Sequence, residues 1–471
     1  MEQQEKGELE RGFMGINHGA ALASLLADQS RVLTQTEVVE QLSKDFYWYS
    51  PVLKKQLDGK MAEMVVQPLS TGEVQTVLGY CYSHAIPVTT RGAGTGNYGQ
   101  AVPLRGGVVL DLSKMDAIEE ILPDGVAVCQ PGVRLGVLET QARKVGWELR
   151  CYPSTLAKAS VGGFIAGGSG GIGSVAHGGL RDFQTVRALE VVTMEAEPRV
   201  VKQEGDAVHE ILHAWGTNGV ITRIWLALAP AVKWSQCVVS FDTFRAAYDF
   251  SEQIAVDDSY TKRLVSAFEW PIPSFFLPIK ALAGEGRSLI FFLIATEHLD
   301  KLESAAGDAS GAIALSGDYV GLQSRPLLSD YTWNHTTLWA MKNDEAYTYL
   351  QCGFDPQRVR EQMRALKERF GSEFLFHMEF MKNGEGKVIP GAIPVVYFTT
   401  EERLKEMIDR CQELGVFVAN PHVNNVEGGG RYRPDNIQLV AKHRYDPQGL
   451  LNPGKMITFE ARTASSEAVA K

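Results

Sequence analysis

Apolar runs of strand length alternate with segments of helical periodicity between residues 33 and about 230. Ser70 to Glu73 resembles a capping box, and the apolar spacing after it predicts a helix over 74–84. Residues 33–60 are predicted to begin as a helix and to continue as a loop. The other elements expected here are strands at 65–66, 86–90, 107–112, 125–130 and 148–152, and a helix at 135–145. Strands and helices in alternation predict an α/β region.

The pattern changes after residue 230, where longer apolar runs lie between helical segments. "SLIFFLIATE" (288–297) and "FLFHMEFM" (374–381) are each expected to form a strand. This pattern predicts a second domain of the α+β class over residues 231–435. Residues 436–456 then predict a helix followed by a turn rich in proline and glycine.

The composition is that of a folded protein with a small-molecule partner. Its 471 residues, 45% of them hydrophobic and 22% charged, can bury a full core and are too many for a single one, so two domains are expected. The net charge of -10 argues against a nucleic-acid partner, because neutralising phosphates requires a basic face. The six cysteines are scattered without a CxxC pair, so we predict neither a zinc site nor disulfides.

The N-terminal stretch and the apolar windows of the chain predict a cytoplasmic protein. "MEQQEKGELERG" lacks the cationic flank and the apolar core of a secretory signal. No window approaches the ~18 uninterrupted apolar residues of a membrane span, so none is expected. The C-terminal "ARTASSEAVAK" is small and polar and is expected to fray.

"TRGAGTGNYGQAVPLRGGVVLDL" (90–112) places a cluster of small residues between two apolar runs. Gly94, Gly96 and Gly99 match GxGxxG, the fingerprint of a nicotinamide dinucleotide site. That fingerprint needs the third glycine inside a helix, but here the chain runs on through Pro103 to another strand. We therefore expect the match to be accidental and the loop itself to wrap a diphosphate with its own N–H groups.

"SVGGFIAGGSGGIGSVAHGG" (160–179) is a second cluster, with nine glycines in the 18 residues that begin at Gly162. So many glycines are too costly in entropy for a packed element unless a ligand or a close backbone crossing requires them. The cluster lacks GxxxxGK followed by Ser or Thr, the pattern of a nucleoside-triphosphate loop. Two glycine clusters about 70 residues apart, each beside α/β structure, predict one extended ligand between two subdomains.

A set of segments in a fixed order carries a family resemblance. The segments are "QPLSTGEVQTVLGYCYSHAIPVTTRGAGTGNYGQAVP", "VVLDLSKM", "VAVCQPGVRLGVLE", "YPSTLAKASVGGFIAGGSGGIGS", "HGGLRDFQTVRALEVVTMEAE", "GTNGVITRIWLALAP" and "YDPQGLLNPGKM". They resemble the vanillyl-alcohol oxidase and p-cresol methylhydroxylase (PCMH) superfamily of FAD oxidoreductases. The most similar branch contains the FAD subunit of glycolate oxidase and the D-lactate dehydrogenases. The resemblance covers residues 33–230 and 436–457, and 231–435 only loosely.

The resemblance implies an α+β fold. A PCMH-type FAD-binding domain of two α/β subdomains would span residues 33–230. An α+β cap domain that lines the substrate pocket would be inserted at 231–435. A C-terminal segment, 436–471, would return to the FAD domain.

The resemblance also implies a site for each part of the cofactor. The pyrophosphate loop and the segment that passes under the flavin fall on the two glycine clusters. Val220 and Ile221 would meet the adenine end through backbone groups. Lys455 would return to the isoalloxazine edge and stabilise the negative charge of reduced flavin near N1. The cofactor-binding residues are therefore expected to be Arg91, Gly92, Ala93, Gly94, Thr95, Thr155, Ser160, Val161, Gly162, Gly163, Ile165, Ala166, Gly167, Val220, Ile221, Asn452 and Lys455.

The chain departs from the family at the points where FAD is attached covalently. Many members attach FAD through a histidine in a pattern like RGxGH, but Thr95 stands at that place here. The cysteine of a second attachment point is also missing, since Leu156 and its neighbours stand there. FAD is therefore expected to be bound without a covalent link.

A flavin takes a hydride at N5, so an alcohol substrate needs a base that removes the proton of its hydroxyl. The cap is expected to supply this base from His335, Glu379 or His422, and Lys455 completes the expected catalytic residues. His377 and Glu379 alternate on one strand and share a face. With His422 they could hold a divalent metal, but the HGDGN-type signature of such sites is absent, so no metal is expected.

We expect an FAD-dependent oxidase or dehydrogenase that acts on the CH–OH group of a 2-hydroxy acid or another small alcohol by hydride transfer to flavin N5. Two alternatives stay open: a nicotinamide-dependent Rossmann enzyme, and a flavin-binding subunit of a larger oxidoreductase complex without its own turnover. The expected partners are a small-molecule substrate and an electron acceptor that the sequence does not identify. The chain could also form a homo-oligomer or dock a redox partner protein.

Overall fold

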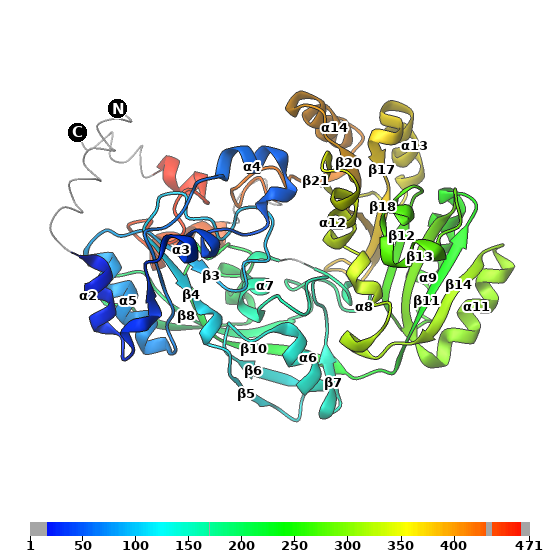
Figure 1. The fold of residues 1–471 in the computed structure, drawn as a ribbon. Coiled ribbons are helices and arrows are strands. Elements are labelled where there is room, and N and C mark those ends of the chain that lie inside the picture. The colour runs from blue at the N-terminus through cyan, green and yellow to red at the C-terminus, as the bar shows by residue number, and fades with distance from the viewer. Residues whose placement is uncertain (1–16, 169, 430–435, 463–471) are drawn as a thin grey trace.

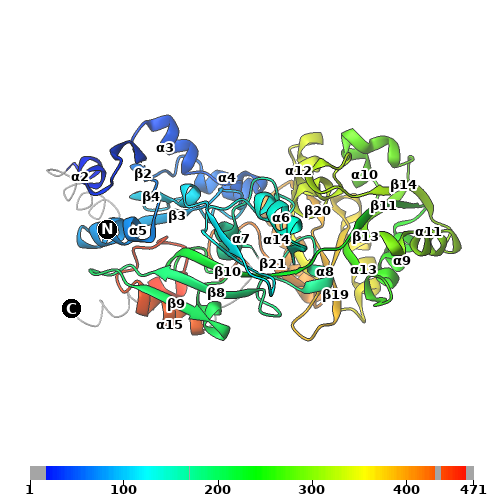
Figure 2. The same ribbon diagram turned by 90° about the horizontal axis from the view of Figure 1, so that it is seen from below.

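The computed structural model describes residues 17–168, 170–429 and 436–462. A cap built from residues 231–429 lies beside a two-part N-terminal region (Figures 1 and 2). The stretch "MEQQEKGELERG" and, from residue 463, the C-terminal tail lie outside these ranges. Within the described ranges, no helix combines the length and the apolar character that a membrane crossing needs.

The first subdomain is a sheet covered by helices. Its elements are α2 (His18–Leu25), β1 (Val32–Leu33), α3 (Thr36–Leu42), α4 (Pro51–Leu57), β2 (Met64–Val66), α5 (Thr71–Ser83), β3 (Val88–Arg91) and β4 (Val108–Asp111). The strand order is β1-β2-β4-β3, and β2, β4 and β3 are parallel. Except for Asp111 at the end of β4, the inner strands consist of buried apolar residues, as is typical of a parallel sheet. The predicted capping residue is confirmed, because the Ser70 hydroxyl accepts a hydrogen bond from the N–H of Glu73.

Residues 51–57 form helix α4 where the sequence predicted a loop. The helix begins after Ser50, whose hydroxyl accepts a hydrogen bond from the N–H of Leu53 at 3.1 Å, and Pro51 occupies its first position. Leu53 and Leu57 are buried on its inner face. A helix of this length shows too little of its 3.6-residue period to be read from the sequence.

The second subdomain is built around the long strand β10. Its elements are β5 (Ile118–Ile121), β6 (Val126–Cys129), α6 (Leu135–Lys144), β7 (Trp147–Leu149), α7 (Val161–Gly167), α8 (Ser174–His177), β8 (Val186–Val192), β9 (Val200–Glu204) and β10 (Val220–Pro230). The strand order is β5-β6-β10-β8-β9, all pairs are antiparallel, and β7 also pairs with β10. The strands predicted at 125–130 and 148–152 and the helix predicted at 135–145 are confirmed with small shifts of their ends, whereas β5, β8, β9 and β10 were not predicted individually.

The cap is an eight-stranded antiparallel sheet with helices on it. Its order is β14-β11-β13-β12-β18-β19-β16-β21, and a small sheet β15-β20-β17 lies beside it. The strands are β11 (Trp234–Phe241), β12 (Lys262–Phe268), β13 (Ser288–Ala295), β14 (Ala312–Asp318), β15 (Tyr347–Tyr349), β16 (Gln351–Gly353), β17 (Phe374–Leu375), β18 (His377–Lys382), β19 (Val388–Ala392), β20 (Val395–Tyr397) and β21 (Phe417–Ala419). The helices are α9 (Phe244–Val256), α10 (Ile272–Phe275), α11 (Leu299–Asp308), α12 (Asn334–Asn343), α13 (Val359–Phe370) and α14 (Glu401–Glu413).

The central strands of the cap are apolar on both faces because both faces are covered. Along β13, Ile290 and Phe292 pack with α9, α11, α13 and α14. Leu289 and Phe291 alternate with them and pack in the core that the cap shares with the second subdomain. The strand predicted from "SLIFFLIATE" is thus confirmed as a buried central strand.

"FLFHMEFM" is divided between two sheets, contrary to the prediction of one strand. β17 belongs to the small sheet and β18 to the large one. Phe376 lies between them and leaves both sheets, because its N–H donates to the Glu269 carboxylate at 2.8 Å and its carbonyl accepts from the N–H of Glu269 at 2.9 Å. The break turns the chain toward β12, beside which β18 then pairs.

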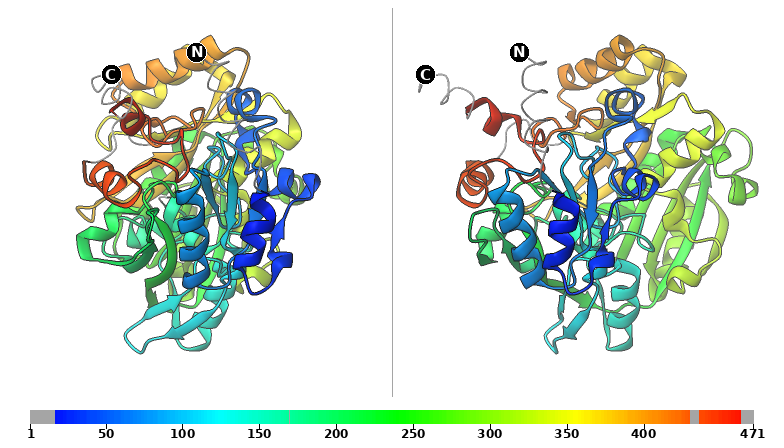
Figure 3. Two further views of the ribbon diagram at one scale, coloured as in Figure 1. Left: turned by 90° about the vertical axis from the view of Figure 1, so that its left-hand side faces the viewer. Right: turned by 60° about the vertical axis from the view of Figure 1, so that its left-hand side comes forward.

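The C-terminal segment lies against the N-terminal region. Helix α15 (Asn436–Tyr445) leads into a bridge between Leu451 and Val88 of β3. The N–H of Asn452 donates to the carbonyl of Val88 at 2.7 Å. Figure 3 shows this orange-to-red end of the chain on the side of the blue-to-green N-terminal region.

A buried charge network joins the cap to the second subdomain. Arg263 of β12 donates to the Glu139 carboxylate of α6 at 3.0 Å and to the carbonyl of Leu149 at 2.9 Å. Its guanidinium also lies 3.7 Å from the carboxylate of Glu148, which accepts from the indole N–H of Trp234. Because Arg263 is fully buried, the network holds the two domains in one relative position.

Candidate active site

A cavity of about 590 Å³ lies where the two N-terminal subdomains and the cap meet. The loop after β3, the residues around α7 and the residues that precede β10 form one part of its wall. Residues of α12, β16, β18, β19 and β21 form the cap side, and a few further residues such as Asp45 and Tyr49 complete the wall. The fold therefore brings both glycine clusters and the cap to one cavity.

The loop after β3 presents free backbone donors to this cavity. The N–H groups of Ala93, Gly94 and Thr95 have no hydrogen-bond acceptor among the described residues. Gly94 has a φ of +64°, and a Cβ on it would lie 2.0 Å from the Arg91 guanidinium, so only glycine fits. Residues 92–107 contain no helix, which excludes the nicotinamide fingerprint.

The second cluster contains a helix where the sequence predicted none. α7 begins after Ser160, whose hydroxyl accepts a hydrogen bond from the N–H of Gly163 at 3.3 Å. Gly92 lies opposite, and a Cβ there would be 2.2 Å from the Ser160 hydroxyl. The two glycine segments therefore face each other at the cavity wall.

Several glycines of the second cluster are required by the protein itself. A Cβ on Gly171 would lie 2.0 Å from the carbonyl oxygen of Tyr152, and one on Gly173 would lie 2.0 Å from that of Arg150. These glycines allow a close backbone crossing, which is one of the two explanations of the glycine cluster given by the sequence. Of the glycines of this cluster that line the cavity, Gly167 has the most room, because a Cβ there would lie 3.4 Å from its nearest neighbour, the Gln100 amide.

Most of the expected cofactor-binding residues line the cavity. Those that do are Arg91, Gly92, Ala93, Gly94, Thr95, Thr155, Ser160, Gly162, Gly163, Ala166, Gly167 and Ile221. The side chains of Val161, Ile165 and Val220 point into hydrophobic cores, and the contact expected of Val220 through its backbone groups stays a prediction. Their side chains support the wall from behind and do not form it.

Lys455 and Asn452 lie behind the first glycine loop and do not line the cavity. The Lys455 ammonium donates to the carbonyl of Gly99 at 2.6 Å. The Asn452 amide donates to the carbonyls of Gln100 and Trp215 at 2.8 and 2.7 Å. The expected contact of Lys455 with the flavin edge is not supported by this position, because its ammonium is directed at the protein backbone.

Lys455 also lies near a buried carboxylate. Burial lowers the pKa of Lys455, and the charge of Asp45 opposes that shift. Burial likewise raises the pKa of Asp45, whose carboxylate accepts from the N–H groups of Tyr47 and Ala101. The pair thus ties residues 99–101, at the far end of the loop, to the protein interior.

His335 and Glu379 of the cap line the cavity. Burial, followed by the charges of Lys342 and Lys158, lowers the pKa of His335 to about 4, so its imidazole is neutral at neutral pH. The Glu379 carboxylate accepts from the Ser266 hydroxyl, from the N–H of Trp333 and from His377. Of the two side chains, that of Glu379 is therefore the more fully hydrogen-bonded to the protein.

His422 lies outside the cavity. Its Nδ1 accepts from the Ser50 hydroxyl at 2.8 Å, and its Nε2 donates to the carbonyl of Tyr349 at 2.9 Å. Burial lowers the pKa of His422 to about 4. Both ring nitrogens are used to join α4 to the cap, so its position does not support the expected catalytic role.

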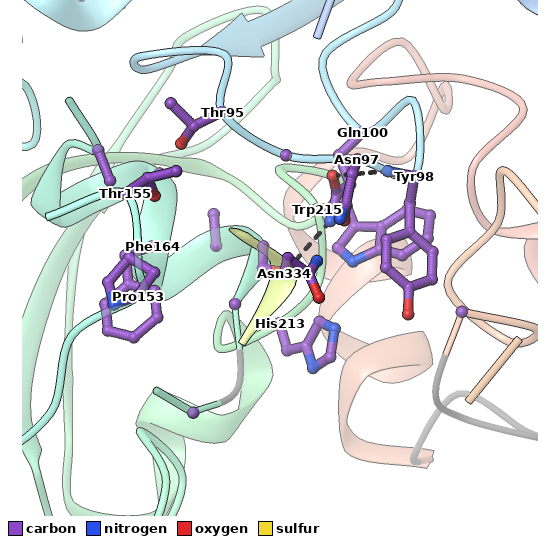
Figure 4. Close-up of a pocket in the computed structure, with 18 of the residues that line it drawn as sticks. Thr95, Asn97, Tyr98, Gln100, Pro153, Thr155, Phe164, His213, Trp215 and Asn334 are labelled. Carbon is purple, nitrogen blue, oxygen red and sulfur yellow. Dashed lines mark hydrogen bonds between the residues drawn. The ribbon is translucent and has the colours of Figure 1, made fainter. Parts of the chain in front are cut away.

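Several residues that line the cavity were not predicted from the sequence. Figure 4 shows Tyr98, Trp215 and His213 near one another, with Thr95 and Thr155 elsewhere on the wall. The sequence carried one signal for the first two residues, since each is an aromatic residue set among small and polar ones. Asn334, next to His335, lines the cap face.

The residues present fit the diphosphate and the rings of a dinucleotide such as FAD. Free N–H groups at 93–95 and the guanidinium of Arg91 suit a diphosphate. Two buried donors of the wall, the Tyr98 hydroxyl and the Trp215 indole N–H, have no partner among the described residues and suit a ring with acceptor atoms. The described residues contain no group of three His, Cys, Asp or Glu side chains that could hold a metal ion.

Comparison with known proteins agrees with this geometry. The profile of a family described as an FAD binding domain matches residues 62–201. The chain is 27% identical over 427 residues to D-lactate dehydrogenase of Archaeoglobus fulgidus, covering 84% of this chain and 91% of that protein. It is 23% identical over 439 residues to glycolate oxidase subunit GlcD of Bacillus subtilis, covering 85% of this chain and 90% of that protein.

A solved structure has the same fold. Alkyldihydroxyacetonephosphate synthase matches with a TM-score of 0.72, covering 93% of this chain and 86% of that chain, at 14% sequence identity. The predicted fold class, a PCMH-type α+β fold, is confirmed by this match together with the family match.

Proposed function

We propose that the chain, which carries an FAD-binding domain and is similar to D-lactate dehydrogenase and glycolate oxidase subunit GlcD, belongs to the vanillyl-alcohol oxidase and PCMH superfamily and oxidises a 2-hydroxy acid or another small alcohol with non-covalently bound FAD. When bound, the flavin supplies a hydride acceptor at N5. The observation that carries the proposal is the cavity in which the FAD-binding domain meets the cap. The names of the relatives, D-lactate dehydrogenase and glycolate oxidase subunit, favour a hydroxy acid.

The loop at 91–95 is the proposed holder of the FAD pyrophosphate. Its free N–H groups and the Arg91 guanidinium offer donors and positive charge to the diphosphate. Thr95 lines the cavity where many relatives carry the histidine that bonds to FAD. Its hydroxyl offers a hydrogen bond and no covalent link, which supports reversible binding.

His335 is the proposed base that removes the proton of the substrate hydroxyl. A base must be unprotonated and must reach the substrate, and His335 is neutral at neutral pH and lines the cap face of the cavity. Glu379 is proposed as a positioning residue, because its carboxylate holds the N–H of Trp333, two residues before His335 in the chain. No metal is part of the proposal.

Trp333 and Asn334 are proposed to bind the polar groups of the substrate. The indole N–H of Trp333 and the amide oxygen of Asn334 are buried without a partner among the described residues. Trp333 has a φ of 50°, a strained value that the bond to Glu379 stabilises. A donor and an acceptor side by side suit a substrate that carries both a hydroxyl and a carbonyl or carboxyl group.

The proposal is tested by adding D-lactate, glycolate and neutral alcohols to the protein without oxygen and following the loss of flavin colour. His335→Gln should slow this reduction by about 10²-fold or more, because the variant lacks the base. In the parent protein the rate should fall as the pH approaches the His335 pKa of about 4, since protonation disables the base.

His422→Gln is the matched control. His422 is equally buried and neutral but lies outside the cavity, so its loss should leave the reduction rate near that of the parent. Equal slowing in both variants would remove His335 as the base. No colour change with any alcohol would contradict the proposed activity itself.

A further inference from the structure

Two buried hydrogen-bond donors of the cavity wall have no acceptor among the described residues. They are the hydroxyl of Tyr98, a residue 5% exposed, and the indole N–H of Trp215, a residue 3% exposed. Both residues line the cavity, and their rings lie 5.6 Å apart. An unpaired buried donor is costly, so a ligand acceptor is expected opposite each one.

The backbone at His213 and Trp215 is strained, and hydrogen bonds to the end of α7 hold it in place. His213 and Trp215 have φ values of 55° and 54°, which non-glycine residues rarely adopt. The end of α7 fixes this turn, since the N–H groups of the two residues donate to the carbonyls of Ile165 and Ala166 at 3.1 and 2.9 Å. Strain that the surroundings hold in place is typical of a functional site.

The C-terminal segment holds both aromatic residues from behind. The Asn452 amide donates to the carbonyl of Trp215 and to that of Gln100, two residues after Tyr98. Lys455 donates to the carbonyl of Gly99, the residue next to Tyr98. Asn452 and Lys455 are therefore positioning residues, and the aromatic pair is what they position.

Tyr98 faces the cap. The thiol of Cys352, on cap strand β16, is an electrostatic neighbour of the Tyr98 hydroxyl, and Cys352 also lines the cavity. The ring that exchanges hydride with the substrate must lie at the cap, because the cap supplies His335 and Glu379. The ring opposite this donor pair is then the isoalloxazine and not the adenine.

We propose, on the basis of the proposed function, that the Tyr98 hydroxyl and the Trp215 indole N–H donate hydrogen bonds to the pyrimidine edge of the isoalloxazine. That edge carries the carbonyl oxygens and N1, whereas the dimethylbenzene edge has no acceptor. Reduction places negative charge near N1, and donors directed at that charge stabilise the reduced form. The pair takes the role that the sequence assigned to Lys455.

The test compares Tyr98→Phe and Trp215→Phe with the parent, each loaded with FAD. Tyr98→Phe removes only the hydroxyl. Trp215→Phe keeps an aromatic ring and removes the N–H donor together with part of the buried indole. The equilibrium constant for flavin reduction is measured against a reference dye, together with the visible absorption of the bound flavin. Each variant should lower that constant about tenfold or more, because hydrogen bonds to a charged group are among the stronger ones.

Tyr349→Phe is the matched control. Its hydroxyl is also buried and has no hydrogen-bond acceptor among the described residues, but Tyr349 does not line the cavity. This variant should keep the reduction equilibrium of the parent, and a shift as large as that of Tyr98→Phe would overturn the proposal. If Trp215→Phe fails to fold, Tyr98→Phe decides alone.

The failure of this inference is distinguishable from that of the proposed function. A parent protein that binds FAD and is bleached by an alcohol, with Tyr98→Phe and Trp215→Phe unchanged in reduction equilibrium and spectrum, would overturn the donor pair alone. A parent protein that takes up no FAD would overturn both.

Discussion

Burial keeps several histidines of this protein neutral at neutral pH. The pKa values of His213, His335 and His422 are each lowered to about 4, with burial as the main cause. In the unfolded chain a histidine takes up a proton near its ordinary pKa of about 6.5. Between these two values the unfolded state binds more protons than the native state, so stability falls as the pH decreases from about 6.5 to about 4.

His422→Gln should reduce this loss of stability in acid. Protonation of His422 in the unfolded chain should lower the free energy of unfolding of the parent by about 2 kcal/mol between about pH 7 and about pH 5. The variant has no histidine at this position, so its free energy of unfolding should fall by about 2 kcal/mol less over the same pH range. Its stability at neutral pH should itself be lower, because the bonds to Ser50 and Tyr349 are changed. Urea unfolding of both proteins at the two pH values measures the difference. The same dependence on pH in parent and variant would show that His422 is not neutral in the fold.

The direction in which the Lys455 side chain points could not be predicted from the sequence. The sequence pattern "LLNPGK" places a lysine at the return to the FAD domain, and the structure places it there. The direction of its ammonium depends on where Gly99 and Asp45 lie, and these are hundreds of residues away in the chain. Long-range geometry of this kind is not readable from a local pattern.

At the level of the elements, the glycine clusters were predictable because turns and phosphate loops are encoded locally. The loop after β3 and its lack of a following helix could be read from residues 90–112. Helix α7 could not, since its sequence, VGGFIAG, has poor helical propensity and depends on the Ser160 cap and on burial. The break at Phe376 also depends on a distant partner, Glu269.

Arg263 of β12 and Glu139 of α6 belong to the buried charge network at the junction of the two domains, and removing Arg263 tests how much this network contributes to stability. Arg263→Met should lower the free energy of unfolding by about 3 kcal/mol, because it removes the fully buried cation of the network and leaves Arg143 to pair with both the Glu139 and the Glu148 carboxylates. Arg369→Met removes an arginine from an exposed ion pair with Glu406 and should cost less than about 1 kcal/mol. Denaturant unfolding of both variants measures the two values. Equal losses would mean that the junction is not held by this network.

For the whole molecule, the candidate site exists only because distant parts of the chain meet. Residues 91–101, 211–221 and 333–393 all contribute to one cavity. The FAD-binding half was predictable, since its signals are local and ordered along the chain. The cap half was not, because the sheet order β12-β18-β19-β16 decides which residues face the cavity. For three of the four expected catalytic residues, only the structure shows what the side chain contacts. Glu379 accepts from the N–H of Trp333, Lys455 donates to the glycine loop, and His422 joins two domains.

The visible absorption spectrum of the purified protein, before and after acid precipitation, tests the central claim most directly. The purified protein should show a flavin spectrum that moves wholly into the supernatant, as expected for FAD bound without a covalent link. A colourless protein that takes up no added FAD would contradict the assignment of the cavity, and flavin that stays with the precipitate would contradict the role of Thr95 as a non-covalent contact.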